Sequence, residues 1–510
     1  MWLNDTCELL ICMCDKLCLR LCIKTFVFRI SVCYSLLFFL FLFKNLNHQI
    51  MTSTKALKLA FIHPDLGIGG AERLVVDAAS SLKAKGHKVV IYTSHHDKEH
   101  CFEETKDGAL EVRVRGDTII PPTLSGSFYA VCAILRQLHL TLSMIFSDRE
   151  EFDVIFVDQL SANIPLLRFA GAKVLFYCHF PDKLLTQRET TAKSLYRIPI
   201  DIIEELTTGM ANCLVVNSKF TSNVFCESFA TIKTMPQILY PGIRFEAYDK
   251  KVNTDDESVK ILETSKNIIL SINRFERKKD IVLAIRAFSM LQEDGLISAE
   301  KFRNTRLIIA GGYDHRVQEN VAHHLDLNKV ALRLDLIVHN IMPDSISAPP
   351  ESAQVVFLCS FNEAQRTYLL SKALCLIYTP SNEHFGIVPI EAMYARLPVI
   401  ACNSGGPKET IIDGETGVLC DSNSEAFAGV IASFVNGDYD REAMGNKGRS
   451  HVQKSFSLDT FINSLEDLLI KLASDNSQNT KFPIQFPLVL FSTLISLFLI
   501  LYNYFDRLFL

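Results

Sequence analysis

The sequence has no excess of positive charge. Its 510 residues hold 52 Lys and Arg against 57 Asp and Glu, which gives a formal net charge of −5. Such a chain offers no broad positive field for a phosphate backbone, so no nucleic acid is expected as a partner. A length of 510 residues exceeds one ordinary core and predicts two domains with attachments.

Paired cysteine motifs are also missing. Six of the 15 cysteines lie in the first 33 residues, and the other nine are scattered singly from Cys101 to Cys420. The N-terminal group lacks Cys-x-x-Cys pairs and nearby histidines, which disfavours a zinc site. Single thiols within apolar runs are typical of a reduced protein that faces the cytosol.

Charge is absent from one long segment near the C-terminus. Residues 486–505 form a run of 20 without a charged side chain, and about 20 apolar residues span the hydrocarbon of a bilayer. We predict a transmembrane or membrane-embedded helix there, with a buried terminal helix of the globular domain as the alternative.

A second candidate anchor, residues 26–43, lies within an N-terminal extension, residues 1–50. Cations flank this segment on both sides, so the charge bias does not select an orientation. The alternative is that the protein starts at Met51, which precedes a polar stretch.

Between the ends, short apolar runs alternate with amphipathic stretches in two series. The first series lies at residues 57–62, 89–92, 154–157, 174–178 and 214–216, and the second at 268–272, 307–310, 355–359, 374–378 and 399–401. Hydrophobic strands alternating with helices predict an α/β fold with parallel sheets covered on both faces. We expect two doubly wound, Rossmann-like domains facing a cleft, residues 55–249 and 267–475, joined by a polar linker, residues 250–266.

Residues 128–146 are apolar but interrupted by Arg136, Gln137 and His139. We predict a core helix. The alternative is an amphipathic helix that rests on a membrane near a lipid acceptor.

Glycines follow the first apolar run of the first domain. Gly67, Gly69 and Gly70 lie at the expected strand-to-helix turn, where the backbone can approach a ligand and the helix N-terminus offers amides to an anion. The spacing G-x-G-x-x-G of dinucleotide-binding proteins is missing, which disfavours a nicotinamide cofactor.

Cations follow the first run of the second domain. Arg274 and Lys279 lie in the segment NRFERKKD, and after a strand such side chains can neutralise a diphosphate. An exposed basic turn is the alternative.

The segment SNEHFGIVPIEA, residues 381–392, carries the strongest signal. It directly follows an apolar run, and Pro389 suits the first turn of a helix. Backbone amides at 385–388 would then face a ligand, with Glu383 and Glu391 on either side. The only D-x-D motif, Asp438–Asp440, follows no strand and is interpreted as surface, so no divalent metal is expected.

These motifs resemble the retaining glycosyltransferases of the GT-B fold, whose hallmark E-x7-E is matched by Glu383 and Glu391. Segments 178–182, 196–217, 273–279 and 310–314 are similar to one family in particular, the alpha-1,3/alpha-1,6-mannosyltransferases of dolichol-linked oligosaccharide assembly. The resemblance covers about residues 57–470 and the apolar tail, but not residues 1–50. Asp280 departs from the glycine that many relatives carry.

The resemblance implies a site. Its catalytic residues are Glu383, His179, Arg274 and Lys279. Its donor-binding residues are Gly69, Gly70, Arg274, Lys279, Glu383, Phe385, Gly386, Ile387 and Glu391. The two cations would neutralise the donor diphosphate, Glu383 and His179 would contact the sugar, and Glu391 would bind the ribose.

The resemblance also implies GDP-mannose as donor, a dolichol-linked oligosaccharide as acceptor and no cofactor. The chain would act at the endoplasmic reticulum membrane with its catalytic domains facing the cytosol, together with other mannosyltransferases of the pathway. Two alternatives are the same fold with a UDP-sugar donor and a non-catalytic membrane scaffold. Intact glutamates and cations argue against the scaffold.

Overall fold

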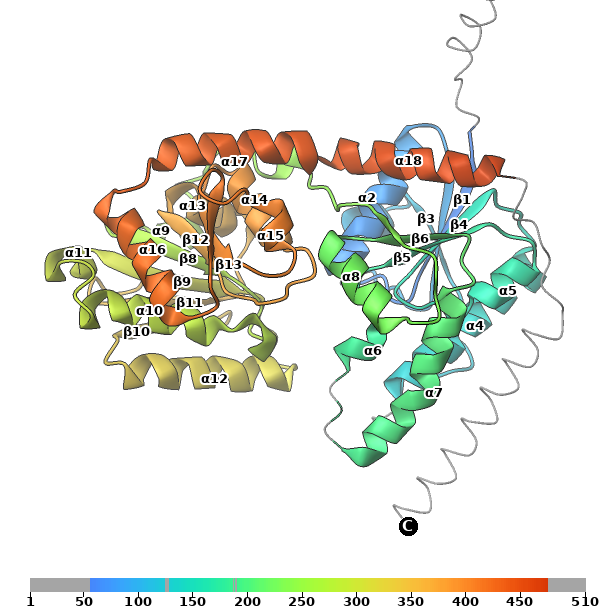
Figure 1. Ribbon diagram of the computed structural model, residues 1–510, viewed down its shortest axis with the longest axis horizontal. Coiled ribbons are helices and arrows are strands. Elements are labelled where there is room, and N and C mark those ends of the chain that lie inside the picture. The colour runs from blue at the N-terminus through green and yellow to red at the C-terminus, as the bar shows by residue number, and fades with distance from the viewer. Residues whose placement is uncertain (1–55, 124–127, 187, 189, 476–510) are drawn as a thin grey trace, which may run out of the picture. The chain divides into compact units, whose positions relative to one another are not determined.

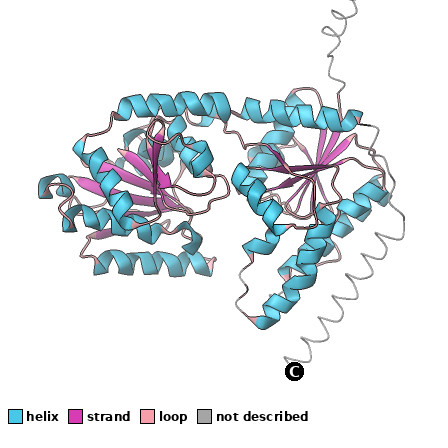
Figure 2. Cartoon of the chain, in the orientation of Figure 1, coloured by secondary structure: helices cyan, strands magenta, loops and turns pink. Residues whose placement is uncertain are grey.

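A computed structural model describes residues 56–123, 128–186, 188 and 190–475. The described residues from Leu57 onward belong to one compact unit. Within it lie two parallel sheets with helices packed against them (Figures 1 and 2). The predicted anchors at residues 26–43 and 486–505, and the extension 1–50, lie outside the described residues.

The first sheet has seven strands in the order β3-β2-β1-β4-β5-β6-β7, all paired in parallel. Its strands are β1 (Lys58–His63), β2 (Lys88–Thr93), β3 (Glu111–Val114), β4 (Val154–Asp158), β5 (Val174–Cys178), β6 (Cys213–Val216) and β7 (Gln237–Ile238). Strands β4 and β5 are buried at every residue, as expected for a sheet covered on both faces.

The second sheet also has seven parallel strands, in the order β10-β11-β9-β8-β12-β13-β14. They are β8 (Asn267–Ile272), β9 (Thr305–Gly311), β10 (Val338–Ile341), β11 (Val355–Cys359), β12 (Cys375–Tyr378), β13 (Val399–Cys402) and β14 (Gly417–Cys420). The predicted α/β class with two Rossmann-like sheets is therefore confirmed. All ten predicted apolar runs overlap strands.

Helices connect successive strands and cover the sheets. Before the linker they are α2 (Gly70–Ala84), α3 (Glu103–Lys106), α4 (Tyr129–Ser143), α5 (Ile164–Phe169), α6 (Asp182–Leu185), α7 (Thr191–Thr208) and α8 (Lys219–Ser228), with the π-helical turn η1 (Met144–Asp148). After it come α10 (Ile281–Glu293), α11 (Ala299–Arg303), α12 (Gln318–Arg333), α13 (Glu363–Lys372), α14 (Ile387–Tyr394), α15 (Pro407–Thr410), α16 (Ser424–Asn436), α17 (Arg441–Ser455) and α18 (Leu458–Ser474). The 3-10 turn η2 (Phe245–Ala247) lies just before the predicted linker 250–266, and helix α9 (Glu257–Lys260) lies within it. The 3-10 turn η3 (Arg277–Lys279) precedes α10.

Helix α18 follows the second sheet in sequence but packs with the first. Its buried apolar side chains belong to the same core cluster as β1 and α2; they are Phe461, Ile462, Leu465, Leu469 and Leu472. The two sheets are thus tied together by the last described helix as well as by the linker.

The segment predicted as a core helix forms α4 and η1. Its inward face includes Ile134 and Leu138, which pack against Ile200 and Ile203 of α7. Among the described residues, 129–148 form the one helix long and apolar enough to cross a membrane, and 44% of its apolar window is buried. One side of this helix therefore belongs to the core.

Candidate active site

A cavity of about 1030 Å³ lies at the carboxyl ends of strands from both sheets. Nine of the ten predicted site residues line it, namely Gly69, Gly70, His179, Arg274, Glu383, Phe385, Gly386, Ile387 and Glu391. The tenth, Lys279, lies beside the lining, with its Nζ 2.5 Å from Glu383 Oε2. Residues from positions more than 300 apart in sequence thus share one cavity.

The turn between β12 and α14 forms one wall of this cavity. Gly386 caps α14 with a φ of +85°, a conformation that glycine adopts without strain. The helix begins at Ile387, and Pro389 lies in its first turn. Amides in the first turn of a helix have no partner within the helix, so this end can bind an anion.

Glu383 lies in this turn beside a cation. Burial favours a raised pKa, but the ion pair with Lys279 outweighs it and holds the pKa of Glu383 below its ordinary value. Tyr378 also donates its hydroxyl to Glu383, at 3.1 Å. Glu383 is therefore ionised at neutral pH and presents a hydrogen-bond acceptor.

Glu391, one helical turn into α14, is half-buried and accepts a short hydrogen bond from the Tyr248 hydroxyl. Burial raises its pKa above the ordinary value, although Tyr248 and Arg366 act in the opposite direction. The Arg366 guanidinium lies 4.8 Å from the centre of the Tyr248 ring. Sequence reasoning missed both partners, because each lies far from Glu391 in sequence.

The basic turn after β8 is partly open to solvent. The Arg274 side chain is 67% exposed and its Nη1 lies 3.3 Å from Glu276 Oε1. A Cβ atom on Gly311 would overlap the carbonyl of Asn273, so the glycine allows β9 to approach this turn. Asp280 has a φ of +44°, in the left-handed region that favours glycine, so the backbone here has a conformation that a glycine would adopt without strain.

A row of ionisable side chains lies across the carboxyl ends of the neighbouring strands β1, β4 and β5. His63 Nδ1 lies 2.8 Å from Asp158 Oδ1, and His179 Nε2 lies 3.0 Å from Asp158 Oδ2. Glu72, in the first turn of α2, faces the other side of the His63 ring at 3.5 Å. Of His63, Asp158 and His179, only His179 lines the cavity.

Burial and the neighbouring charges together determine the protonation states of His63 and Asp158. Burial lowers the pKa of His63, but Asp158 and Glu72 outweigh it and raise that pKa to about 10. Burial likewise favours a neutral Asp158, yet His63 and His179 hold its pKa below the ordinary value. A protonated His63 thus keeps a fully buried Asp158 ionised behind His179.

The glycine turn after β13 holds the wall in place. Gly405 has a φ of +63°, and a Cβ atom there would lie 2.6 Å from the backbone nitrogen of Glu383. The backbone nitrogen of Gly406 donates to the Glu383 carbonyl at 2.7 Å. The second glycine turn therefore supports the first one rather than a ligand.

We expect Gly405→Ala to lower the free energy of unfolding by about 1–3 kcal/mol, because the added methyl displaces the Glu383 backbone. The matched control is Gly414→Ala, since Gly414 has a similar φ of +73° with no atom within 4 Å of its Cβ position. Denaturant unfolding of both variants separates the clash from the backbone strain. Equal losses in the two variants would contradict the supporting role.

Loops that follow strands of the two sheets contact each other at the cavity, where Phe180 and His384 belong to the lining. The rings of Phe180 and His384 stack at 3.7 Å with an interplanar angle of 7°. Burial lowers the pKa of His384 to about 4, so this ring is neutral. Ser218 donates to the His384 carbonyl at 2.6 Å, and Glu409 accepts from the first amides of α8.

Over the described ranges, no group of three or more His, Cys, Asp or Glu side chains is arranged to hold a metal ion. In the D-x-D segment, Asp438 and Asp440 are exposed, and the Asp440 side chain accepts from the Ala443 amide at the start of α17. The interpretation of this motif as a surface element agrees with that geometry.

Two family models match the chain. The model described as Glycosyltransferase Family 4 matches residues 68–246, and that described as Glycosyl transferases group 1 matches residues 253–336 and 345–451. Among solved structures, sucrose-phosphate synthase from Thermosynechococcus elongatus has a TM-score of 0.62 at 18% identity, over 82% of this chain and 99% of that one. This likeness supports the GT-B fold.

Curated relatives are much closer in sequence. The alpha-1,3/1,6-mannosyltransferase ALG2 of Rhizomucor pusillus is 56% identical over 425 residues, which cover 83% of this chain and 93% of the relative. The human protein of the same name is 45% identical over 417 residues, covering 81% of this chain and 95% of the relative.

Proposed function

The chain belongs to the family of alpha-1,3/1,6-mannosyltransferases, and we propose that it transfers mannose from GDP-mannose to a dolichol-diphosphate-linked oligosaccharide. It is a retaining glycosyltransferase of N-glycan precursor assembly. By the family's reaction, an alpha-1,3 addition precedes an alpha-1,6 addition. The proposal specifies the donor, the acceptor and the residues that act on them.

The observation that carries the proposal is the convergence of cations and helix amides on one side of the cavity. Arg274 and the start of α14 line it, and Lys279 lies next to the lining carboxylate Glu383. Departure of a nucleoside diphosphate builds negative charge on phosphate oxygens and positive character on the sugar. Fixed donors aimed at that charge stabilise it by roughly 2–4 kcal/mol each.

Lys279 and Glu383 have paired roles in this mechanism. Lys279 compensates the partly buried Glu383 carboxylate. With donor bound, Lys279 would reach the diphosphate while Glu383 accepts hydrogen bonds from mannose hydroxyls. Glu391 would accept from the ribose hydroxyls in the place where it now accepts from Tyr248.

His179 would contact the transferred sugar. Its Nε2 faces an ionised carboxylate, which can only accept, so the neutral ring carries its proton on Nε2. Nδ1 is then an acceptor for a sugar hydroxyl. Retention would proceed on one face of the sugar, with the leaving phosphate taking the proton of the acceptor hydroxyl.

The proposed location is the endoplasmic reticulum membrane, with the catalytic domains on the cytosolic side and other mannosyltransferases of the pathway as neighbours. All nine described cysteines are free thiols. Free thiols are expected of a chain that folds in a reducing compartment. The uncharged run at residues 486–505 supports attachment to a bilayer.

The donor assignment can be tested by comparing how nucleotide sugars bind to the purified full-length protein. We expect GDP-mannose to raise the unfolding temperature more than UDP-glucose or UDP-N-acetylglucosamine, because a ligand stabilises the state that binds it. Radiolabelled mannose should then pass to a synthetic lipid-linked acceptor, with and without chelator. Protection by UDP-sugars alone would overturn the donor assignment.

A second arm addresses the scaffold alternative. We expect Glu383→Ala to lose transfer while keeping its fold, because the sugar-binding acceptor is removed. Undiminished transfer by Glu383→Ala would reject the role of this residue.

A further inference from the structure

Helix α7 turns its aliphatic side outward. Four large side chains are exposed on one helical face, with exposed fractions from 46% to 63%; they are Leu195, Ile198, Ile202 and Leu206. From residue 194 to the end of the helix these are the only exposed side chains. A surface helix of a globular protein normally shows the opposite pattern, with its charged face in water.

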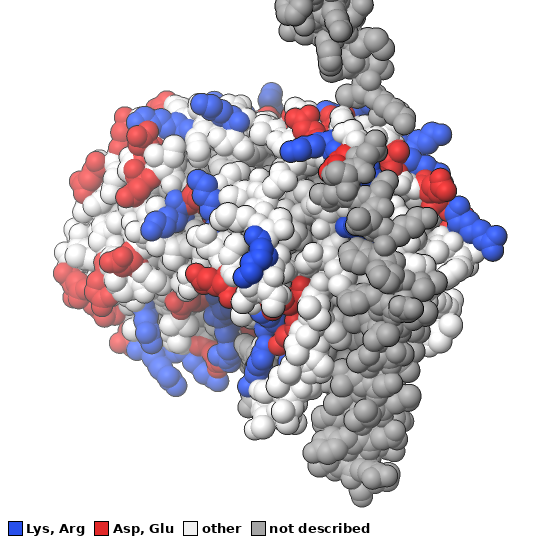
Figure 3. Space-filling view, turned by 45° about the vertical axis from the view of Figure 1, so that its right-hand side comes forward, with Lys and Arg blue, Asp and Glu red and all other residues white. Residues whose placement is uncertain are grey.

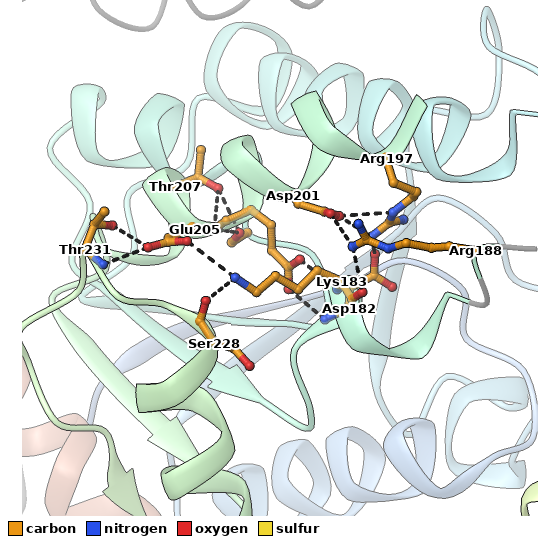
Figure 4. A network of polar contacts seen from close by, with 11 residues as sticks. Asp182, Lys183, Arg188, Arg197, Asp201, Glu205, Thr207, Ser228 and Thr231 are labelled. Carbon is orange, nitrogen blue, oxygen red and sulfur yellow. Dashed lines mark hydrogen bonds and ion pairs between the residues drawn. The ribbon is translucent and has the colours of Figure 1, made fainter. Parts of the chain in front are cut away.

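The charged side of α7 faces the protein instead. Arg197 is buried and lies 2.8 Å from Asp182 of α6 and 3.0 Å from Asp201, as Figure 4 shows. Arg188 reaches Asp201 from the loop before the helix, at 2.5 Å. This cluster fixes the first half of α7 against α6.

The second half is fixed by its two glutamates. Glu204 accepts from the backbone amides of Asp182 and Lys183, at 2.7 and 3.0 Å. Glu205 accepts from the amide and hydroxyl of Thr231, at 2.8 and 2.7 Å (Figure 4). Every charged side chain of α7 except Lys193 is therefore engaged inside the molecule, and the orientation of the helix is fixed.

The aliphatic surface continues onto α6 and reaches the cavity. Leu184 and Leu185 are about half exposed, and Leu185 and Asp182 also line the cavity. We call the surface formed by Leu184, Leu185, Leu195, Ile198, Ile202 and Leu206 the α6–α7 face. In Figure 3 the lowest part of the described surface, where α7 lies in Figure 1, is mostly white.

The composition of the α6–α7 face indicates what kind of partner binds there. It holds only Leu and Ile, whereas protein interfaces are enriched in aromatic side chains and Arg. Among the described residues beside it, Lys193 and Arg188 are exposed cations, and the one acidic side chain of α6, Asp182, is 37% exposed and is paired with Arg197. Aliphatic side chains edged by cations are the pattern of a helix that lies in a lipid interface.

We propose that the α6–α7 face rests on a lipid bilayer and that the lipid-linked acceptor enters the cavity beside α6 from that bilayer. The second part rests on the proposed function, since only a lipid-linked acceptor needs a path between membrane and cavity. The cavity lip at Leu185 then lies at the membrane surface. The pyrophosphate-linked sugars would reach the donor while the polyisoprenoid stays in lipid.

Depth-dependent fluorescence quenching tests the membrane contact. The chain has a single tryptophan, Trp2, so a Trp2→Phe parent carries no indole of its own. In this full-length parent, Ile202→Trp places a probe on the face, and Leu325→Trp on α12 is the matched control. Both side chains are 53% exposed.

Each variant is mixed with phosphatidylcholine vesicles that contain ordinary or brominated acyl chains. We expect the emission of Ile202→Trp to shift to shorter wavelength and to fall with brominated chains, while that of Leu325→Trp is the same in both vesicles. Absence of quenching at position 202, or equal quenching at 325, overturns the proposal. Because no donor is needed, this result does not depend on the proposed function.

A kinetic arm tests the acceptor path. The variant Ile198→Gln/Ile202→Gln/Leu206→Gln should raise KM for a vesicle-borne acceptor roughly tenfold or more, since each aliphatic side chain buried in lipid favours docking by about that factor. Its activity on a water-soluble short-chain acceptor and its protection by GDP-mannose should match those of Leu325→Gln/Leu332→Gln. An unchanged KM for the vesicle-borne acceptor would reject the path, whereas inactivity of the unmodified protein on both acceptors would reject the proposed function instead.

Discussion

Asp158→Asn is expected to lower kcat by about 10²–10⁴-fold while leaving GDP-mannose binding nearly unchanged, since a buried carboxylate that fixes a histidine tautomer can contribute that much. Asp158 lies outside the cavity lining and acts through His179, whose Nε2 is 3.0 Å away. It is a positioning residue.

The physical reason is the direction of one hydrogen bond. The carboxylate accepts from His179 Nε2 and leaves Nδ1 as an acceptor in the cavity. An amide in its place can donate to Nε2, which moves the ring proton to Nδ1 and removes that acceptor. One of the two anions that raise the pKa of His63 is lost as well, so this pKa falls, although Glu72 still raises it.

Steady-state kinetics with GDP-mannose, together with a donor-binding measurement, checks this expectation. The matched control is Asp153→Asn, since Asp153 lies just before the start of β4, at the end opposite Asp158, and accepts from the Lys58 amide at 2.7 Å. The double variant with His179→Asn should be hardly slower than His179→Asn alone, because both changes remove one function. Additive losses would show that Asp158 does not act through His179.

Lys279→Met should lower kcat/KM on the order of 10²–10³-fold, the usual effect of removing one fixed donor that stabilises transition-state charge. The neighbouring cation Arg277 offers a matched control. It pairs with Asp326 at 2.6 Å, whereas Lys279 pairs with the cavity-lining Glu383, so Arg277→Met should change kcat/KM little. Comparable losses in the two variants would mean that η3 acts through its overall charge.

The substitution Lys279→Met should also change the pH dependence of kcat/KM. Lys279 is the principal partner that offsets burial and keeps the pKa of Glu383 low. Without it the pKa of Glu383 rises, so Glu383 binds a proton at a higher pH than in the unmodified protein. The acidic limb of the kcat/KM profile should therefore move to higher pH in Lys279→Met and stay in place in Arg277→Met.

The interior of both sheets could be predicted from sequence because each central strand is a continuous apolar run. Four strands were missed, and each of them is an edge strand; they are β3, β7, β10 and β14. An edge strand has one neighbour and is partly solvated, so it lacks that run. Strand β3 has no fully buried residue, and both residues of β7 are exposed.

Site residues were predictable where the chemistry is local in sequence. Around the turn that carries Glu383, the sequence shows an apolar strand, then a glycine and then a proline at the start of a helix. Asp158 and Tyr248 were not predicted, because their roles arise from pairing across strands or between distant loops. One local signal existed for Asp158, an acidic residue that ends a wholly buried strand at the ligand-binding edge.

Helix α18 limits how this enzyme can be recombined. Because Phe461 and Leu465 complete the core against α2 and β1, the half of the sequence that forms the second sheet ends with a helix that the first half needs. A chimaera that joins the first half of this chain to the second half of another enzyme at the linker would carry a foreign α18 in the core of its first half. Successful exchange of specificity requires two junctions, one near the linker and one between α17 and α18, so that the last helix stays with its original partner.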